Sequence, residues 1–164
     1  MNRKSEQGAV LIVSLIMLLV MTVIGLAGME VTNLEEKMAG NMRDRNIAFQ
    51  AAEAALSDAE DYLQSTTLLP AFNGSVAGLY SRDSDLWESV NWTGTGAVKT
   101  YSGDGFDNLA EAPAYVIESL DVVSDSDSLE LGSAADTKSY YRISARAVGQ
   151  TDTAEVILQS VYKR

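Results

Sequence analysis

The chain of 164 residues has no cysteine and no histidine, and it has only two prolines. Without cysteine there are no disulfides, so an exported domain must be held together by the packing of its core. The same two absences exclude thiol nucleophiles, serine–histidine triads and the usual zinc sites. Carboxylate and hydroxyl chemistry remain open, but the sequence carries no catalytic motif. We therefore expect no enzyme activity and no cofactor.

Positive charge is also scarce, with 12 basic side chains against 23 acidic ones and a net charge of −11. Nucleic acids and anionic headgroups would repel such a chain, so we expect no nucleic-acid partner.

About 135 residues follow the apolar segment at residues 9–28. That length is enough for one modest domain and not for two.

Residues 9–28 form twenty consecutive positions without a charged side chain. At about 1.5 Å per residue, a helix of this length covers the roughly 30 Å hydrocarbon layer of a bilayer. Its polar residues, Ser14 and Thr22, are expected to bond back to their own helix. Arg3 and Lys4 precede the run, so the positive-inside rule leaves the N-terminus in the cytoplasm. The sequence predicts a membrane-inserted chain with an exported domain.

Three interpretations of this segment stay open on length alone. The run fits a plain uncleaved anchor. It is longer than the core of an ordinary signal peptide, although the small residues up to Gly28 resemble a cleavage site. In the third interpretation the cut follows Gly8, and the mature chain begins with the membrane helix itself.

The helical pattern continues beyond the apolar run. Residues 29–64 contain no proline and are rich in good helix formers. Apolar residues recur at steps of four and form one stripe, namely Ile47, Ala51, Ala55, Ala59 and Leu63. We predict one helix from about residue 9 to 64 with an apolar half (9–28) and an amphipathic half (29–64). Glycine disfavours helix, so three positions are candidate weak points: Gly25, Gly28 and Gly40.

Residues 65–164 are predicted to form the globular part. Residues 73–112 are punctuated by glycine, with one short helix or strand expected around residues 84–90. The aromatic side chains of this connection are expected to cover the helix and the sheet.

The last third of the chain predicts β-structure. Residues 114–123 are rich in β-branched and aromatic types, and residues 139–148 and 154–163 alternate with the period of a half-buried strand. Residues 149–153 join the last two strands as a hairpin. The amphipathic helix would cover an antiparallel sheet of at least three strands. The predicted fold class is α+β.

Two acidic loops are rich enough in carboxylates to be candidate calcium sites, residues 102–108 and 124–128. Neither matches the spacing of an EF-hand, and solvated turns explain both. Asp83 and Asp85 are close in sequence, but no pattern places them in a cleft. We therefore predict no metal site.

The stretch after the apolar run carries a combination of residues that is specific enough to indicate a protein family. Leu34–Asn41 reads LEEKMAGN, and Arg43–Asn46 and Ala48–Leu56 follow it. With the leader and the apolar run, this stretch resembles the N-terminal part of PilX-type minor pilins of type IV pili. The similarity covers about residues 7–60. From residue 64 onward only the helix-then-sheet order is pilin-like.

The resemblance implies a processing and assembly route. A prepilin peptidase would remove residues 1–8 by cutting after Gly8, and the new terminus at Ala9 would be methylated. Before assembly the chain would lie in the inner membrane with its C-terminal domain in the periplasm. The helix would then join other minor pilins and the major pilin in an extracellular filament, and a tip adhesin is a candidate partner. Adhesion and twitching motility are the activities that such a filament serves.

One position departs from the pattern of the family. Most type IV pilins carry glutamate at the fifth mature position, where this chain has Val13. The resemblance implies that in such pilins this carboxylate pairs with the amino terminus of a neighbouring subunit. Our hypothesis is that this subunit lies at the tip, with no pilin ahead of it, and helps to initiate assembly.

Charged residues outside the membrane are expected to pair between subunits. Exposed pairs contribute about 0.2–1 kcal/mol each, so they would set register more than stability. The residues are Glu30, Glu35, Glu36, Lys37, Arg43 and Arg45.

Two alternatives to a minor pilin of a type IV pilus remain open. They are a tip minor pseudopilin of a type II secretion system, and a single-pass membrane-anchored binding protein.

Overall fold

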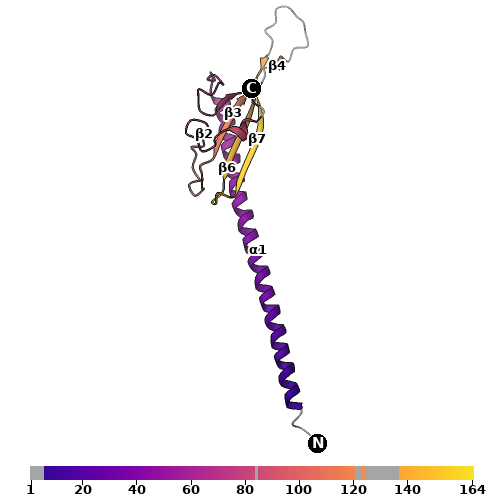
Figure 1. The fold of residues 1–164 in the computed structure, drawn as a ribbon. Coiled ribbons are helices and arrows are strands. Elements are labelled where there is room, and N and C mark those ends of the chain that lie inside the picture. The colour runs from indigo at the N-terminus through magenta and orange to yellow at the C-terminus, as the bar shows by residue number, and fades with distance from the viewer. Residues whose placement is uncertain (1–5, 84, 121–122, 125–136) are drawn as a thin grey trace, which may run out of the picture. The chain divides into compact units, whose positions relative to one another are not determined.

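The structure is a computed structural model, and it describes residues 6–83, 85–120, 123–124 and 137–164. The chain divides into two compact units, residues 1–42 and 43–164, and α1 runs from the first into the second. The elements in chain order (Figure 1) are α1 (Glu6–Ser65), β1 (Leu79–Ser81), α2 (Leu86–Ser89), β2 (Lys99–Thr100), β3 (Ala114–Ser119), β4 (Val123–Ser124), β5 (Thr137–Lys138), β6 (Tyr140–Val148) and β7 (Glu155–Lys163).

The long helix is confirmed. It was expected from about residue 9 to 64, and α1 ends at Ser65. Gly25, Gly28 and Gly40 lie inside α1 without interrupting its helical backbone. None of them has a positive φ angle, so each keeps ordinary helical geometry.

The main sheet has the strand order β1-β3-β6-β7, and β2 pairs with β3 beside β1. The pairs β3–β6 and β6–β7 are antiparallel, and the turn after β6 forms the predicted hairpin. The predicted antiparallel sheet of at least three strands is confirmed, and β1, which the sequence did not predict, pairs with β3 in parallel. The sheet is therefore mixed. A strand of three residues is too short to show alternation, so the sequence pattern missed β1.

The predicted apolar stripe of α1 forms one wall of the core. Ile47 is half-buried at its start, and small side chains dominate the rest, which lets the helix approach the sheet closely. Its fully buried members are Ala51, Ala55, Ala59 and Leu63, and the flanking Ala48 and Ala52 are fully buried beside them. Facing them are buried residues of β1, β3 and β6, among them Leu79, Ile117, Ile143 and Ala145. This packing confirms the predicted α+β layering.

The opposite face of the sheet is covered by the connection between β1 and β3. Leu86 of α2 and Val98 pack on Val116 of β3. Tyr80 and Trp92 add to this cluster, as expected for the aromatics of the connection. Their polar groups are satisfied, since the Tyr80 hydroxyl donates to the Ala97 carbonyl at 2.7 Å and the Trp92 indole to the Trp87 carbonyl at 3.0 Å.

A buried ion pair holds the start of that connection on the sheet. Glu118 of β3 is fully buried, and Arg142 of β6 donates to both of its carboxylate oxygens, at 2.7 and 2.8 Å. The backbone N–H of Asp83 donates to the same carboxylate at 3.0 Å, and Arg142 donates to the Asp83 carbonyl. The hydrogen bonds that Arg142 donates to Glu118 raise the pKa of Arg142. Removing one partner of such a buried pair typically costs about 3–5 kcal/mol.

Asp44 of α1 fastens the helix to the β6–β7 turn. Its carboxylate accepts hydrogen bonds from the backbone N–H groups of Gln150, at 2.6 Å, and Thr151, at 3.2 Å. The hydroxyl of Thr151 donates to the same carboxylate. These bonds lower the pKa of Asp44, the one from the Thr151 hydroxyl most. We refer to this contact as the Asp44 latch.

Gly149 makes the latch possible because it has no side chain. A Cβ atom at this position would overlap the Asp44 carboxylate and lie 2.9 Å from the Asp44 backbone oxygen. Neither group can move away easily, since one is helix backbone and the other is held by the turn.

We predict that Gly149→Ala destabilises the second unit by about 1–3 kcal/mol through overpacking. Tryptophan fluorescence reports this unfolding, because Trp87 and Trp92 both lie in the second unit. The midpoint temperature should fall by about 4 °C per kcal/mol for a unit of this size. Gly40→Ala is the matched control, since a Cβ there meets nothing within 4 Å. Equal midpoints for wild type and Gly149→Ala would contradict the tight approach.

Candidate assembly surface

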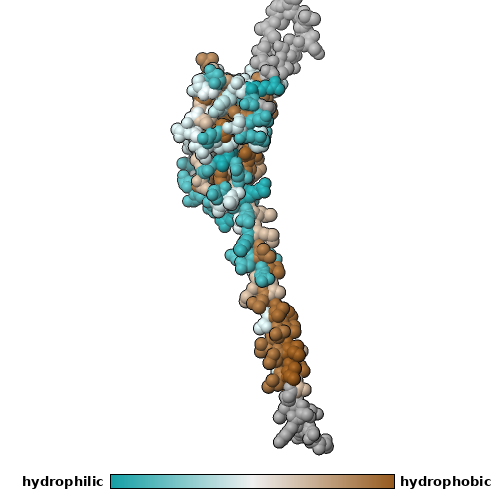
Figure 2. All heavy atoms as spheres, viewed as in Figure 1, coloured by the Kyte–Doolittle hydropathy of each residue, from teal (hydrophilic) through white to brown (hydrophobic). Residues whose placement is uncertain are grey.

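The apolar half of α1 is uncovered in the structure. Figure 2 shows hydrophobic side chains along this part of the helix. Their exposed fractions are high, for example 68% at Val10, 67% at Leu18 and 70% at Met21. Within the described residues α1 is the one helix long and apolar enough to cross a membrane, by length and composition. So much apolar surface is unfavourable in water, and it requires lipid or other helices as its surroundings.

The polar side chains of this half are already satisfied within the helix. Ser14 donates to the Leu11 carbonyl at 2.9 Å. Thr22 donates to the carbonyls of Leu18 and Leu19, at 3.0 and 2.7 Å. The expected back-bonding is therefore confirmed. Neither hydroxyl would bring an unpaired donor into an apolar environment.

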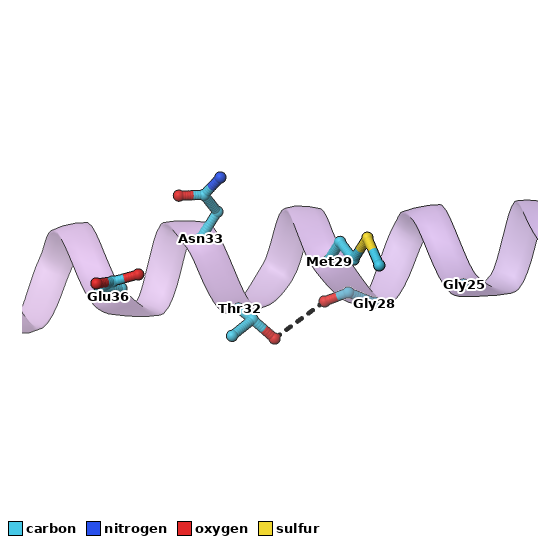
Figure 3. Close-up of a pocket in the computed structure, with 6 residues that line it drawn as sticks. All are labelled: Gly25, Gly28, Met29, Thr32, Asn33 and Glu36. Atoms are coloured by element: carbon cyan, nitrogen blue, oxygen red, sulfur yellow. Dashed lines mark hydrogen bonds between the residues drawn. The ribbon is translucent and has the colours of Figure 1, made fainter.

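A shallow hollow interrupts the apolar surface at two glycines (Figure 3). A Cβ atom at Gly25 or Gly28 would meet nothing within 4 Å. Thr32 turns back to the helix, and its hydroxyl donates to the Gly28 carbonyl at 3.1 Å. The hollow thus offers a close approach to the helix backbone, which is how small residues act in helix pairs. Its lining residues are Gly25, Gly28, Met29, Thr32, Asn33 and Glu36.

The charged residues predicted to pair between subunits are all exposed. No ion pair joins any two of them in the part of the chain that the structure describes. Four lie in the first unit and two in the second, and these residues are Glu30, Glu35, Glu36, Lys37, Arg43 and Arg45. The structure therefore does not gather them into an internal cluster. They remain available to other chains, as the prediction requires.

Gly8, Ala9 and Val13 all lie on α1. Ala9 is exposed and Val13 is 57% exposed. Most of the predicted leader, residues 1–5, lies outside the described residues, so cleavage after Gly8 remains a prediction.

The acidic loops contribute no metal centre to the described structure. Across residues 6–83, 85–120, 123–124 and 137–164, no group of three or more His, Cys, Asp or Glu side chains is placed to hold an ion. Most of the loop at residues 124–128 lies outside these ranges. Asp83 acts through its backbone, in the contact with Glu118 and Arg142 described above.

Sequence reasoning missed the polar contacts of the second unit. Arg146 donates to Glu111 and Glu155, each at 2.6 Å, and fixes the loop before β3 to the β6–β7 pair. Glu111 lies on a loop 35 positions from Arg146, so no spacing rule reveals that pair, whereas Glu155 lies only nine positions away, across the β6–β7 hairpin. The one local signal was the alternation that placed Arg142 and Arg146 on the same face of a strand.

A helix with an uncovered apolar half, followed by a half that packs on a small mixed sheet, defines the pilin-like class of α+β proteins. The family model for the PilX N-terminal region matches residues 7–57. The model for the C-terminal part of type IV pilus assembly protein PilX matches residues 44–164. The chain belongs to the PilX family of type IV pilus assembly proteins.

The two matches confirm the resemblance and extend it. It was predicted from about residues 7–60, and the C-terminal match now includes the sheet domain, where sequence reasoning found no independent likeness. The matches overlap at residues 44–57, in the part of α1 that begins at the Asp44 latch. No curated protein and no solved structure matches the chain significantly.

We predict that Gly28→Leu leaves the helix intact but lowers incorporation into pili several-fold, because leucine fills the hollow. Leucine is the better helix former, by up to about 1 kcal/mol. The measurement is the ratio of the chain in sheared pili to the chain in whole cells, by quantitative immunoblot. Gly40→Leu carries the same change on α1 outside the hollow and should assemble normally. Equal incorporation of both variants would exclude a role for the hollow.

Proposed function

We propose that this member of the PilX family is a minor pilin that primes assembly of a type IV pilus and lies at its tip. The observation that supports the proposal best is the apolar half of α1, which nothing in the described chain covers and which carries no acidic residue. Such a helix can be stored in lipid and transferred into a bundle of other pilin helices. The role is structural and not catalytic.

The proposed route begins in the inner membrane, with the C-terminal domain in the periplasm. Prepilin peptidase cuts after Gly8, which removes Arg3 and Lys4 with the leader, and Ala9 is then methylated. Those two charges hold the helix end at the cytoplasmic face. Without them the helix can leave the bilayer. The move exchanges one apolar environment for another, so it costs little free energy.

Val13 supports a position of this subunit at the tip of the pilus. A carboxylate in the hydrocarbon layer costs about 2.5–3.5 kcal/mol on insertion scales unless an opposite charge compensates it. A subunit that docks behind another can obtain that compensation from the amino terminus ahead of it. Val13 neither provides nor needs such a partner. A first subunit with no pilin ahead of it fits this side chain.

The proposed partners follow from this position in the filament. They are prepilin peptidase, other minor pilins and the major pilin, together with a tip adhesin. Contacts between the charged residues of neighbouring helices would fix axial register, since exposed pairs are individually weak. The finished filament is extracellular and serves adhesion and twitching motility.

The test is Val13→Glu, followed by a count of surface pili and by immunogold labelling of the chain on them. We expect several-fold fewer pili and loss of label from the tips, because the new carboxylate has no partner. Val13→Leu is the control and should keep both. Normal piliation with unchanged tip labelling in Val13→Glu would remove the argument from this position.

Deletion of the gene separates the proposal from its alternatives. A priming minor pilin predicts loss of surface filaments and of twitching. A tip minor pseudopilin predicts normal pili with a defect in type II secretion. An anchored binding protein predicts neither defect and an uncleaved N-terminus.

A further inference from the structure

The outer strand β7 (Glu155–Lys163) has a regular free edge. At one end of the β6–β7 pair, Ser139 and Arg164 exchange both backbone hydrogen bonds, at 3.0 and 2.9 Å. At the other end, Gly149 donates to the Ala154 carbonyl at 2.9 Å. The register between these ends has no bulge. Hydrogen-bonded pairs alternate along an antiparallel ladder, so the even-numbered residues of β7 bond to β6.

The odd-numbered residues of β7 therefore direct their N–H and C=O groups to the open side of the sheet. No strand among the described residues pairs with this side. The residues are Glu155, Ile157, Gln159, Val161 and Lys163. We refer to them as the β7 edge.

The side chains of the β7 edge lie on the sheet face away from α1. The even-numbered residues face α1 instead, where Tyr162 joins the main core cluster and Ser160 donates to Glu60 at 3.2 Å. On the outer face Val161 is 62% exposed. The usual protection of an edge, by proline, a bulge or a central charge, is missing from β7.

We propose that the β7 edge is a docking site for an extended segment of a partner protein, which adds to the sheet as an antiparallel strand. Backbone hydrogen bonds at five alternate residues would supply the affinity, as in other cases of strand addition. The side chains define the partner. It carries a basic residue opposite Glu155 and an acidic residue opposite Lys163, with apolar residues opposite Ile157 and Val161.

Both end charges are available for such pairing. Glu155 is 46% exposed, and the bond from Arg146 occupies only its Oε1 atom. Lys163 is exposed, and its Nζ lies 5.9 Å from the centre of the Tyr140 ring, a loose contact. The opposite ends of the edge thus carry opposite charges, which fixes the direction of the incoming strand.

A second copy of this chain is not the occupant, and this step rests on the proposed function. β7 runs in the same direction as α1 in the second unit, because Asp44 contacts Thr151 and Glu60 contacts Ser160. Two copies joined by antiparallel β7 strands would therefore set these helix segments in opposite directions. Subunits whose α1 helices lie parallel in one filament, as the proposed function requires, cannot adopt that arrangement.

The probe is a synthetic peptide with the sequence of residues 154–164. When the peptide pairs antiparallel with β7 so that the two Gln159 residues face each other, Lys163 of the peptide lies opposite Glu155 of the chain. Glu155 of the peptide then lies opposite Lys163 of the chain. The peptide therefore has the required charge order without the membrane helix. The full chain in detergent is titrated with this peptide, and amide hydrogen exchange is followed by NMR. We expect exchange at residues 157, 159 and 161 to slow by at least about tenfold on binding, with the even-numbered amides unchanged.

Charge reversal tests the direction of the strand. A peptide with Glu155→Lys and Lys163→Glu should bind about tenfold more weakly, since both end pairs become repulsive. A peptide with Glu155→Lys alone places a lysine opposite Lys163 of the chain and should bind weakly. Lys163→Glu in the chain puts opposite charges there again and should restore part of the binding of that peptide. Val161→Pro in the chain removes an outward N–H, leaves the ladder to β6 intact and should abolish peptide binding.

Two results would overturn the proposal. They are unchanged exchange at the odd-numbered amides, and equal binding of the native and charge-reversed peptides. Neither bears on priming, because the Val13→Glu test uses piliation as its readout.

Discussion

The apolar half of α1 is the constraint on which the rest of the molecule depends. Twenty residues without charge cannot remain in water, and the described chain supplies nothing to cover them. Their hydroxyl groups are already paired inside the helix, so either lipid or other helices can surround it. The apolar half of α1 is therefore covered only when lipid or the helices of other chains pack around it. The protein's membership of a type IV pilus assembly family is consistent with that requirement.

The same helix changes character in the second unit, where it becomes one wall of a core. A stripe of alanines brings it close to the sheet, and the Asp44 latch fixes it to the β6–β7 turn. Without disulfides, buried polar contacts such as Glu118 with Arg142 hold the long connections in place. Stability in this domain therefore rests on individual contacts between segments that are far apart in sequence. The free edge of β7 is the exception, since it ends the sheet without a partner among the described residues.

Sequence reasoning recovered the features that are periodic. The apolar run, the stripe from Ile47 to Leu63 and the alternation in β6 each repeat over many residues, and each prediction was confirmed. Features that depend on pairing across the chain were missed. β1 has three residues, and its parallel pairing is set by a long connection that carries no pattern. The bond of Asp44 to Thr151 spans 107 positions, which no local rule reveals. The charged residues predicted for assembly are all exposed, and their pairing with other chains stays a prediction.

The proposed function requires that this helix becomes the amino end of the mature protein and enters the filament. Mass spectrometry of the native chain, taken from sheared pili and from inner membranes, decides this point. We expect a chain that begins at N-methylated Ala9 in both fractions, with residues 1–8 absent. A chain in either fraction that keeps Met1, or a soluble periplasmic chain that begins after Gly28, would contradict it.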